Sequence, residues 1–163
     1  MNTVNDFTLP LHSRVWIYQS SRFLAPPEVE NVLQTTQEFL AEWNSHGNQL
    51  SAEIQLLHNL FLVIAVDEAA AMASGCSIDK SVRMVKQLEN KLNVSLTGRT
   101  TLAYLDESKN IQLKNLADFK KQMENGNISP QTVIFNNLLS TLADFKSNWT
   151  IPASQSWLGD IRI

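Results

Sequence analysis

The sequence predicts an α+β fold: a ferredoxin-like (split βαβ) antiparallel sheet with two helices, and a C-terminal α/β extension that covers the sheet. Residues 14–19 and 60–66 are apolar on both sides, as expected of internal strands. Residues 50–57 alternate between apolar and polar, as expected of a strand with one wet face. Two segments with helical spacing complete the order strand, helix, strand, strand, helix, strand up to Leu105.

The first helix is predicted to follow the strand at 14–19. Pro26-Pro27-Glu28 opens it, because proline fits the first helical turn and a carboxylate favours the positive end of the helix. Apolar residues at helical spacing continue as far as Trp43. His46-Gly47 is expected to end the helix, with glycine available for a left-handed cap.

The middle of the chain predicts a hairpin and a second helix. His58-Asn59 separates the strand 50–57 from the strand 60–66 and fits a two-residue turn, because asparagine tolerates positive φ. The second helix is predicted from about Ser77 to Leu92, with a buried apolar stripe.

The rest of the chain predicts a fourth strand and an extension. Residues 101–105 form the strand, residues 106–110 turn, and residues 111–113 can pair back. The extension is expected to hold a helix, a strand and a helix, at 116–123, 132–135 and 138–149. We expect one domain over residues 1–163, with the ferredoxin-like core at 1–113 and the extension, 114–163, packed on it. Two helices cover only one sheet face, so the extension or a partner subunit must cover the other.

Composition limits the functions that are expected. With 163 residues and a formal net charge of −3, the chain lacks the clustered Lys and Arg of nucleic-acid or anionic-membrane binding. One cysteine makes no internal disulfide, which fits a reducing compartment. The longest apolar run has seven residues, and a membrane-spanning helix needs about 20. No signal peptide is read at the N-terminus. These observations predict a cytoplasmic protein.

The predicted ligand site lies where the strand 60–66 ends and the second helix begins, a common place for a ligand or a reactive group. Its candidate ligand-binding residues are Asp67, Glu68, Ser74, Gly75, Cys76, Ser77 and Asp79. The free N–H groups of a helix start attract anions, but Ser77 or Asp79 can equally act as the helix cap.

Two further groups in this segment have alternative interpretations. Cys76 can be a nucleophile at a helix N-terminus or a small packed hydrophobe. The phosphatase spacing Cys-x5-Arg is not met, because six residues separate Cys76 from Arg83. Asp67 and Glu68 can act as acid and base or bind a metal, or they can be a solvated exit from the sheet. No cysteine or histidine spacing indicates a zinc site, and neither a cofactor nor a catalytic residue is assigned.

Five blocks of the chain carry a resemblance: residues 13–19, His46-Gly47, Val66-Asp67-Glu68, residues 73–79 and residues 133–138. With these blocks the chain resembles a family of small uncharacterised bacterial proteins that are often labelled "ABC transporter ATPase". The label implies ATP hydrolysis, which needs Gly-x4-Gly-Lys-Ser/Thr, and none of the five glycines is followed by lysine. We therefore expect no hydrolysis of that kind.

The sequence predicts a non-catalytic module that binds a small ligand or a protein partner, with a homodimer through the apolar sheet face as one possibility. The alternative is a small enzyme with its site around Asp67, Glu68 and Cys76.

Overall fold

The computed structural model describes residues 3–69 and 71–160, which divide into two compact units. The first unit holds the described residues up to Thr97 together with Leu138–Lys146, and the second holds Gly98–Asn137 and the residues from Ser147 onward. The predicted boundary at residue 113 therefore differs from the boundary of these units. Whether both units fold as one domain stays a prediction, and residues 161–163 of the predicted extension lie outside the described part.

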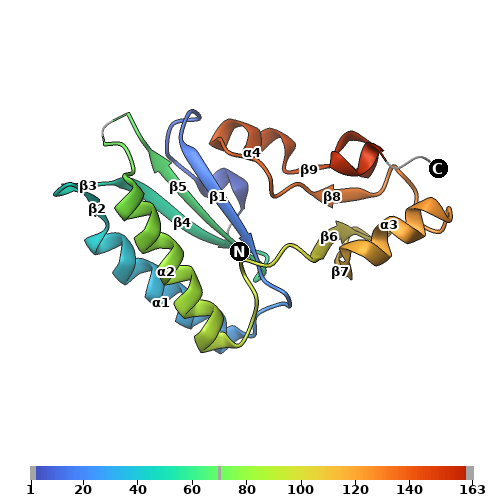
Figure 1. The fold of residues 1–163 in the computed structure, drawn as a ribbon, viewed down its shortest axis with the longest axis horizontal. Coiled ribbons are helices and arrows are strands. Elements are labelled where there is room, and N and C mark those ends of the chain that lie inside the picture. Colours follow the sequence, from blue (N-terminus) through green and yellow to red (C-terminus); the bar gives the residue numbers. More distant parts are fainter. Residues whose placement is uncertain (1–2, 70, 161–163) are drawn as a thin grey trace. The chain divides into compact units, whose positions relative to one another are not determined.

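The first unit is built around a mixed set of helices and strands (Figure 1). In chain order they are η1 (Val4–Asp6), β1 (Arg14–Gln19), α1 (Pro26–Glu42), β2 (Asn44–Ser45), β3 (Asn48–Gln49), β4 (Ser51–Leu57), β5 (Phe61–Asp67) and α2 (Gly75–Leu92). α4 (Leu142–Asn148) begins in this unit.

β5 lies at the centre of the first sheet, in the order β1-β5-β4, and both of its pairings are antiparallel. All residues from Phe61 to Val66 are buried, which explains why this run is apolar on both sides. His58 and Asn59 have φ of 55° and 53° and form the predicted hairpin turn between β4 and β5. The mixed helix–strand class with antiparallel sheets is therefore confirmed, while the short strands β2 and β3, which were not predicted, lie between α1 and β4.

The predicted position of the fourth strand is wrong. Residues 101–105 belong to another sheet, so the complete ferredoxin-like arrangement is not confirmed. The free edge of β1 is contacted instead by a later segment: the Val15 N–H donates to the Ser140 carbonyl at 2.9 Å, and the Leu142 N–H donates to the Ser13 carbonyl at 2.8 Å. An apolar pattern specifies a buried strand but not which neighbour pairs with its edge, since the pairing is made by backbone groups that every residue carries.

α1 and α2 pack on one face of this sheet. Their core with the sheet includes Val32, Trp43, Ile64, Val85 and Leu88. Both helices lie on the same side of the sheet, so the side chains between them are positioned by two neighbouring helices.

The opposite face of the sheet carries Glu53, which accepts hydrogen bonds from the Thr8 N–H at 3.0 Å and from the Thr8 hydroxyl. Phe7 stacks edge-on against Phe145 of α4, with ring centroids 5.9 Å apart. Lys146 Nζ donates to the Phe7 carbonyl at 2.8 Å. Within this unit, the start of α4 thus packs against the N-terminal segment.

The second unit contains β6 (Thr101–Leu105), β7 (Ile111–Asn115), α3 (Leu116–Glu124), β8 (Val133–Phe135), β9 (Thr150–Pro152), η2 (Ala153–Gln155) and η3 (Trp157–Asp160). Its sheet has the order β7-β6-β8-β9, with antiparallel pairs. The predicted pairing of residues 111–113 with 101–105 is confirmed. β9 was not predicted, because a strand of three residues is too short to show a period. The core of this unit is formed by Leu102, Phe119, Met123, Ile134, Ala153 and Leu158.

Two predicted helix boundaries are also wrong. α1 ends at Glu42, because Trp43 is extended (φ −77°, ψ 118°), and His46-Gly47 is instead the turn of the β2–β3 hairpin, with φ of 51° and 81°. The predicted helix over residues 138–149 begins only at Leu142.

Within residues 3–69 and 71–160, every helix is too short or too polar to traverse a lipid bilayer.

Candidate functional site

The segment from Asp67, the last residue of β5, to Asp79 in α2 carries all seven predicted site residues, and most of their polar groups bond within it. Ser74, not Ser77 or Asp79, caps α2: its Oγ accepts from the Ser77 N–H at 3.1 Å. The Ser77 hydroxyl donates back to the Ser74 carbonyl at 2.8 Å. α2 therefore begins at Gly75, two residues before the predicted start, because a serine before the first turn satisfies one of the unpaired N–H groups there.

The two adjacent carboxylates of the segment have different partners. Asp67 Oδ1 accepts from the Ala69 N–H at 3.0 Å and lies 2.9 Å from His12 Nε2. The Ala69 N–H, followed by His12, lowers the pKa of Asp67. Glu68 Oε2 accepts from the Ala73 N–H at 3.0 Å. Both carboxylates therefore accept hydrogen bonds from backbone N–H groups that follow β5. Within the described residues, no group of three His, Cys, Asp or Glu side chains is placed to hold a metal ion.

Cys76 is a free, exposed thiol in the first turn of α2, so its interpretation as a packed hydrophobe is wrong. The helical pattern places Ser77 on the buried side of this turn and Cys76 one residue earlier, about 100° away around the helix. Gly75 and Asp79 are exposed as well.

Sequence reasoning missed His12 and Arg14, which precede β1 or begin it. Arg14 Nη1 lies 3.6 Å from Glu68 Oε1, and its guanidinium carbon lies 4.5 Å from the centre of the Trp16 ring. The register of the sheet brings them here, since Arg14 is paired with Val66 immediately before Asp67. The approach of His12 and Arg14 to the two carboxylates depends on the antiparallel register of β1 with β5, which the sequence alone does not specify.

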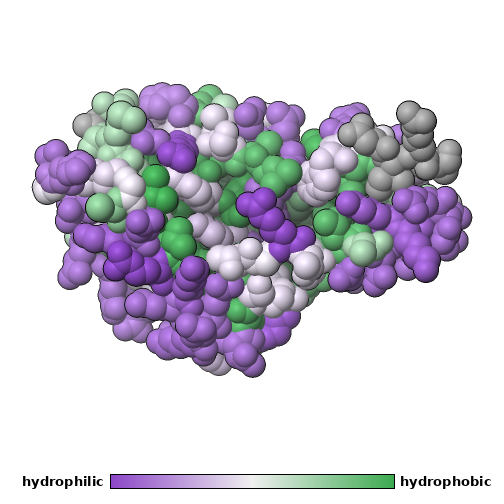
Figure 2. All heavy atoms as spheres, in the orientation of Figure 1, coloured by the Kyte–Doolittle hydropathy of each residue, from purple (hydrophilic) through white to green (hydrophobic). Residues whose placement is uncertain are grey.

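A groove of about 610 Å³ lies between α1 and α2 in the first unit. It is lined by Thr35, Glu38, Phe39 and Glu42 of α1, and by Lys80, Arg83 and Gln87 of α2. The α1 residues recur every three or four positions over about two turns, so one stripe of each helix forms one wall. Figure 2 shows that the surface over these two helices is mainly hydrophilic.

The floor of the groove is apolar. Phe39 and the buried residues Trp43 and Met84 line it. The Phe39 and Trp43 rings lie 5.0 Å apart at 39°. Trp43 Nε1 donates to the Ser77 carbonyl at 2.8 Å, which fixes the indole and joins the end of α1 to the first turn of α2. An indole that is buried in this way keeps its only donor paired.

The charged side chains of the groove are exposed and face solvent: Glu38 and Glu42 on α1, Lys80 and Arg83 on α2. Glu38 accepts from Gln34 of the same helix at 3.0 Å. Among the ion pairs within 4.0 Å that the described residues form, none joins the acidic residues of α1 to the basic residues of α2. Helical spacing in the sequence could have indicated these four residues, because each pair borders an apolar stripe.

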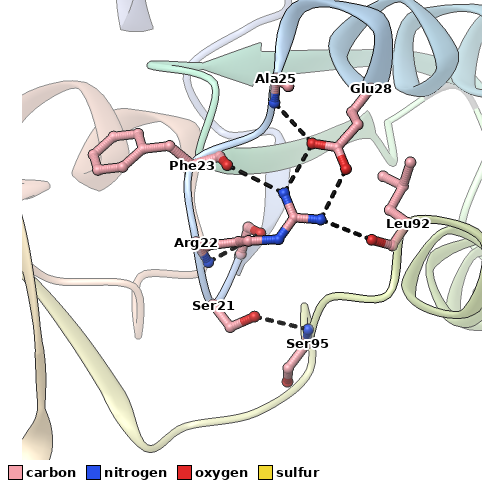
Figure 3. Close-up of polar contacts among 8 residues, drawn as sticks. Ser21, Arg22, Phe23, Ala25, Glu28, Leu92 and Ser95 are labelled. Atoms are coloured by element: carbon pink, nitrogen blue, oxygen red, sulfur yellow. Dashed lines mark hydrogen bonds and ion pairs between the residues drawn. The ribbon is translucent and has the colours of Figure 1, made fainter.

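The other ends of the two helices are joined by Arg22 (Figure 3). Its guanidinium forms a bidentate pair with Glu28 at 2.8 and 2.9 Å and donates to the Leu92 carbonyl at 2.9 Å. Glu28 also accepts from the Ala25 N–H at 2.7 Å. The hydrogen bond from Arg22, followed by that from Ala25, lowers the pKa of Glu28 to about 2. Arg22 thus places a cation at the end of α2 and Glu28 an anion at the start of α1, as the helix dipoles favour.

No family model matches the chain, and no curated protein or solved structure matches it. The resemblance to small bacterial proteins labelled "ABC transporter ATPase" therefore stays a prediction.

Proposed function

We propose that this protein is a non-catalytic, cytosolic binding module that holds a small ligand in the groove between α1 and α2. One observation carries the proposal: the groove combines an apolar floor with charged side chains on both walls. Small-molecule sites in proteins are concave and combine apolar surface with polar groups that orient the ligand.

The contrast with the predicted site supports this choice. The carboxylates and hydroxyls from Asp67 to Ser77 form hydrogen bonds within their own segment or with His12, and Glu68 also forms an ion pair with Arg14. A ligand there would have to compete with these bonds. The ammonium of Lys80 and the guanidinium of Arg83 are exposed, so a ligand that reaches them displaces only water.

A thermal-shift screen of the purified chain tests the proposal. The panel contains amino acids, short peptides, nucleotides, sugar phosphates and divalent metals. A ligand of the folded state raises the melting temperature by mass action. We expect at least one member to do so, with the shift reduced in Lys80→Ala and retained in Lys86→Ala, a matched change on α2 outside the groove lining. A panel that yields no shift, or a shift that Lys80→Ala leaves intact, contradicts the proposal.

One observation favours the alternative of a small enzyme. His12 Nε2 lies 2.9 Å from Asp67 Oδ1, and the imidazole is 61% exposed, so a carboxylate orients a histidine that is open to solvent. Histidine in such a pairing serves as a general base in many enzymes. If an activity is found, His12→Ala must abolish it while leaving the melting temperature within a few degrees of that of the unaltered chain.

A further inference from the structure

α1 and α2 run antiparallel, and this fixes which residues of the groove face each other. Trp43 follows the end of α1 and bonds to Ser77 in the first turn of α2. At the other ends, Arg22, which pairs with Glu28 of α1, bonds to Leu92, the last residue of α2. One helix therefore rises along the groove as the other descends.

Acidic and basic residues consequently lie along the same stretch of the groove. Counting residues from the Trp43–Ser77 contact, Lys80 lies between the levels of Glu42 and Glu38, and Arg83 lies at about the level of Glu38. These residues form an acidic wall and a basic wall, and no ion pair within 4.0 Å closes the space between them in the described residues.

We infer that the groove takes a short peptide with free ends, most simply a dipeptide, held by its ammonium group on the acidic wall and its carboxylate on the basic wall. The inference rests on the proposed function, since it names the class of ligand for the same groove. Glu38 and Glu42 accept from the ammonium, and Lys80 and Arg83 donate to the carboxylate. An apolar side chain lies over Phe39.

The walls disfavour ligands with one kind of charge. A phosphate or a nucleotide meets the carboxylates of Glu38 and Glu42, whereas a polyamine or a metal ion meets Lys80 and Arg83, and like charges at close range are unfavourable. A dipeptide carries both charges, at ends that lie about 7 Å apart when each residue spans about 3.5 Å.

Isothermal titration with four forms of the dipeptide Leu-Leu tests the inference: free, N-acetylated, C-amidated, and blocked at both ends. We expect the free form to bind most tightly. Each single block should weaken binding about threefold to tenfold, the range for a charge-assisted contact that remains partly exposed. The doubly blocked form should bind most weakly.

Charge-removing variants assign each end of the ligand to a wall. The double variant Glu38→Gln with Glu42→Gln should weaken the free and C-amidated forms, and leave the N-acetylated form unchanged, since that form has no ammonium. The double variant Lys80→Gln with Arg83→Gln should weaken the free and N-acetylated forms only. Glu30→Gln and Lys86→Gln, on the same helices but outside the lining, are the matched controls and should change none of the affinities. Unchanged circular dichroism and melting temperatures show that the variants are folded.

The possible results separate the inference from the proposed function. Equal binding of all four forms overturns the inference but leaves a groove that binds ligands. Absence of binding by any form also overturns it, and the thermal-shift screen then decides separately whether the groove binds another class. Binding that neither double variant changes places the peptide elsewhere and overturns the inference, and the thermal-shift screen again decides the proposed function.

Discussion

The segment between β5 and α2 and the groove between α1 and α2 lie in the same unit, yet their polar groups are used differently. In the segment, Ser74, Ser77, Asp67 and Glu68 bond to neighbouring backbone groups or to side chains of β1 and its approach. In the groove, charged side chains from two helices face solvent across an apolar floor. Candidate residues in a strand-to-helix loop can therefore serve the fold, while a helix pair supplies the surface open to a ligand.

The two regions meet at Trp43, and changing it is expected to have the largest effect. Trp43→Phe removes part of a side chain that is 2% exposed, together with the hydrogen bond from its indole to the Ser77 carbonyl. We expect a loss of about 2–3 kcal/mol in the free energy of unfolding, from the cavity and the lost hydrogen bond together. Urea denaturation measures it. A loss below about 0.5 kcal/mol would show that the indole does not fix the groove floor.

Ser74→Ala should lower stability without changing ligand affinity, and it therefore distinguishes the roles of the two regions. Loss of the α2 cap should cost about 1 kcal/mol of stability, because an N–H of the first turn loses its acceptor. Asp79→Ala is the control, since Asp79 is exposed and lies outside the cap, and surface changes of that kind cost less than about 0.5 kcal/mol. Ligand affinity in the groove should be the same for both variants. A loss of affinity in Ser74→Ala with intact stability would return the functional role to the segment.

Acid should loosen the end of the helix pair that lies far from Trp43. The pKa of Glu28 is lowered from 4.5 to about 2 in the folded chain, so ionised Glu28 stabilises the fold above about pH 4.5, and this contribution is lost as the pH falls toward 2. Denaturation of the unaltered chain and of Glu28→Gln, at pH 5 and at pH 3, checks this. The difference between the two chains should be larger at pH 5. An equal difference at both pH values would mean that Arg22 does not hold the carboxylate.

The smallest effect is expected beside His12. The Ser13 hydroxyl is buried and has no hydrogen-bond partner among the described residues. Ser13→Ala removes an unpaired polar group, so the free energy of unfolding should stay the same or rise by less than about 1 kcal/mol. Ser13→Val, which adds bulk at a fully buried position, serves as the contrast and should destabilise. Destabilisation by Ser13→Ala would reveal a partner for the hydroxyl.

Local structure was predictable where a pattern was long and regular. The two-sided apolar run at 60–66 identified the central strand, and His58-Asn59 identified the turn, because both signals act over a few neighbouring residues. The neighbour of β1 on the edge away from β5 was not predictable, because that edge offers the same backbone groups to residues 101–105 and to residues 140–142.

The candidate site was predicted by position but not by role. The sequence placed Asp67 and Glu68 at a strand end, yet it gave no sign of His12 and Arg14, which reach them through the register of β1 with β5. The sequence left Cys76 open between a packed position, which is common for cysteine, and a reactive one, and the structure shows that the thiol is exposed in the first turn of α2. The groove needs two helices at a given distance, which no single-segment pattern contains.

The central claim is that ligand binds between α1 and α2 and not at the segment before α2. Titration of the ¹⁵N-labelled chain with free Leu-Leu, followed by amide chemical shifts, tests it most directly. We expect chemical-shift changes confined to the amides of residues 35–43 and 80–87, with the amides of residues 67–74 unchanged. Shifts centred on residues 67–74, with the groove amides unchanged, would contradict it.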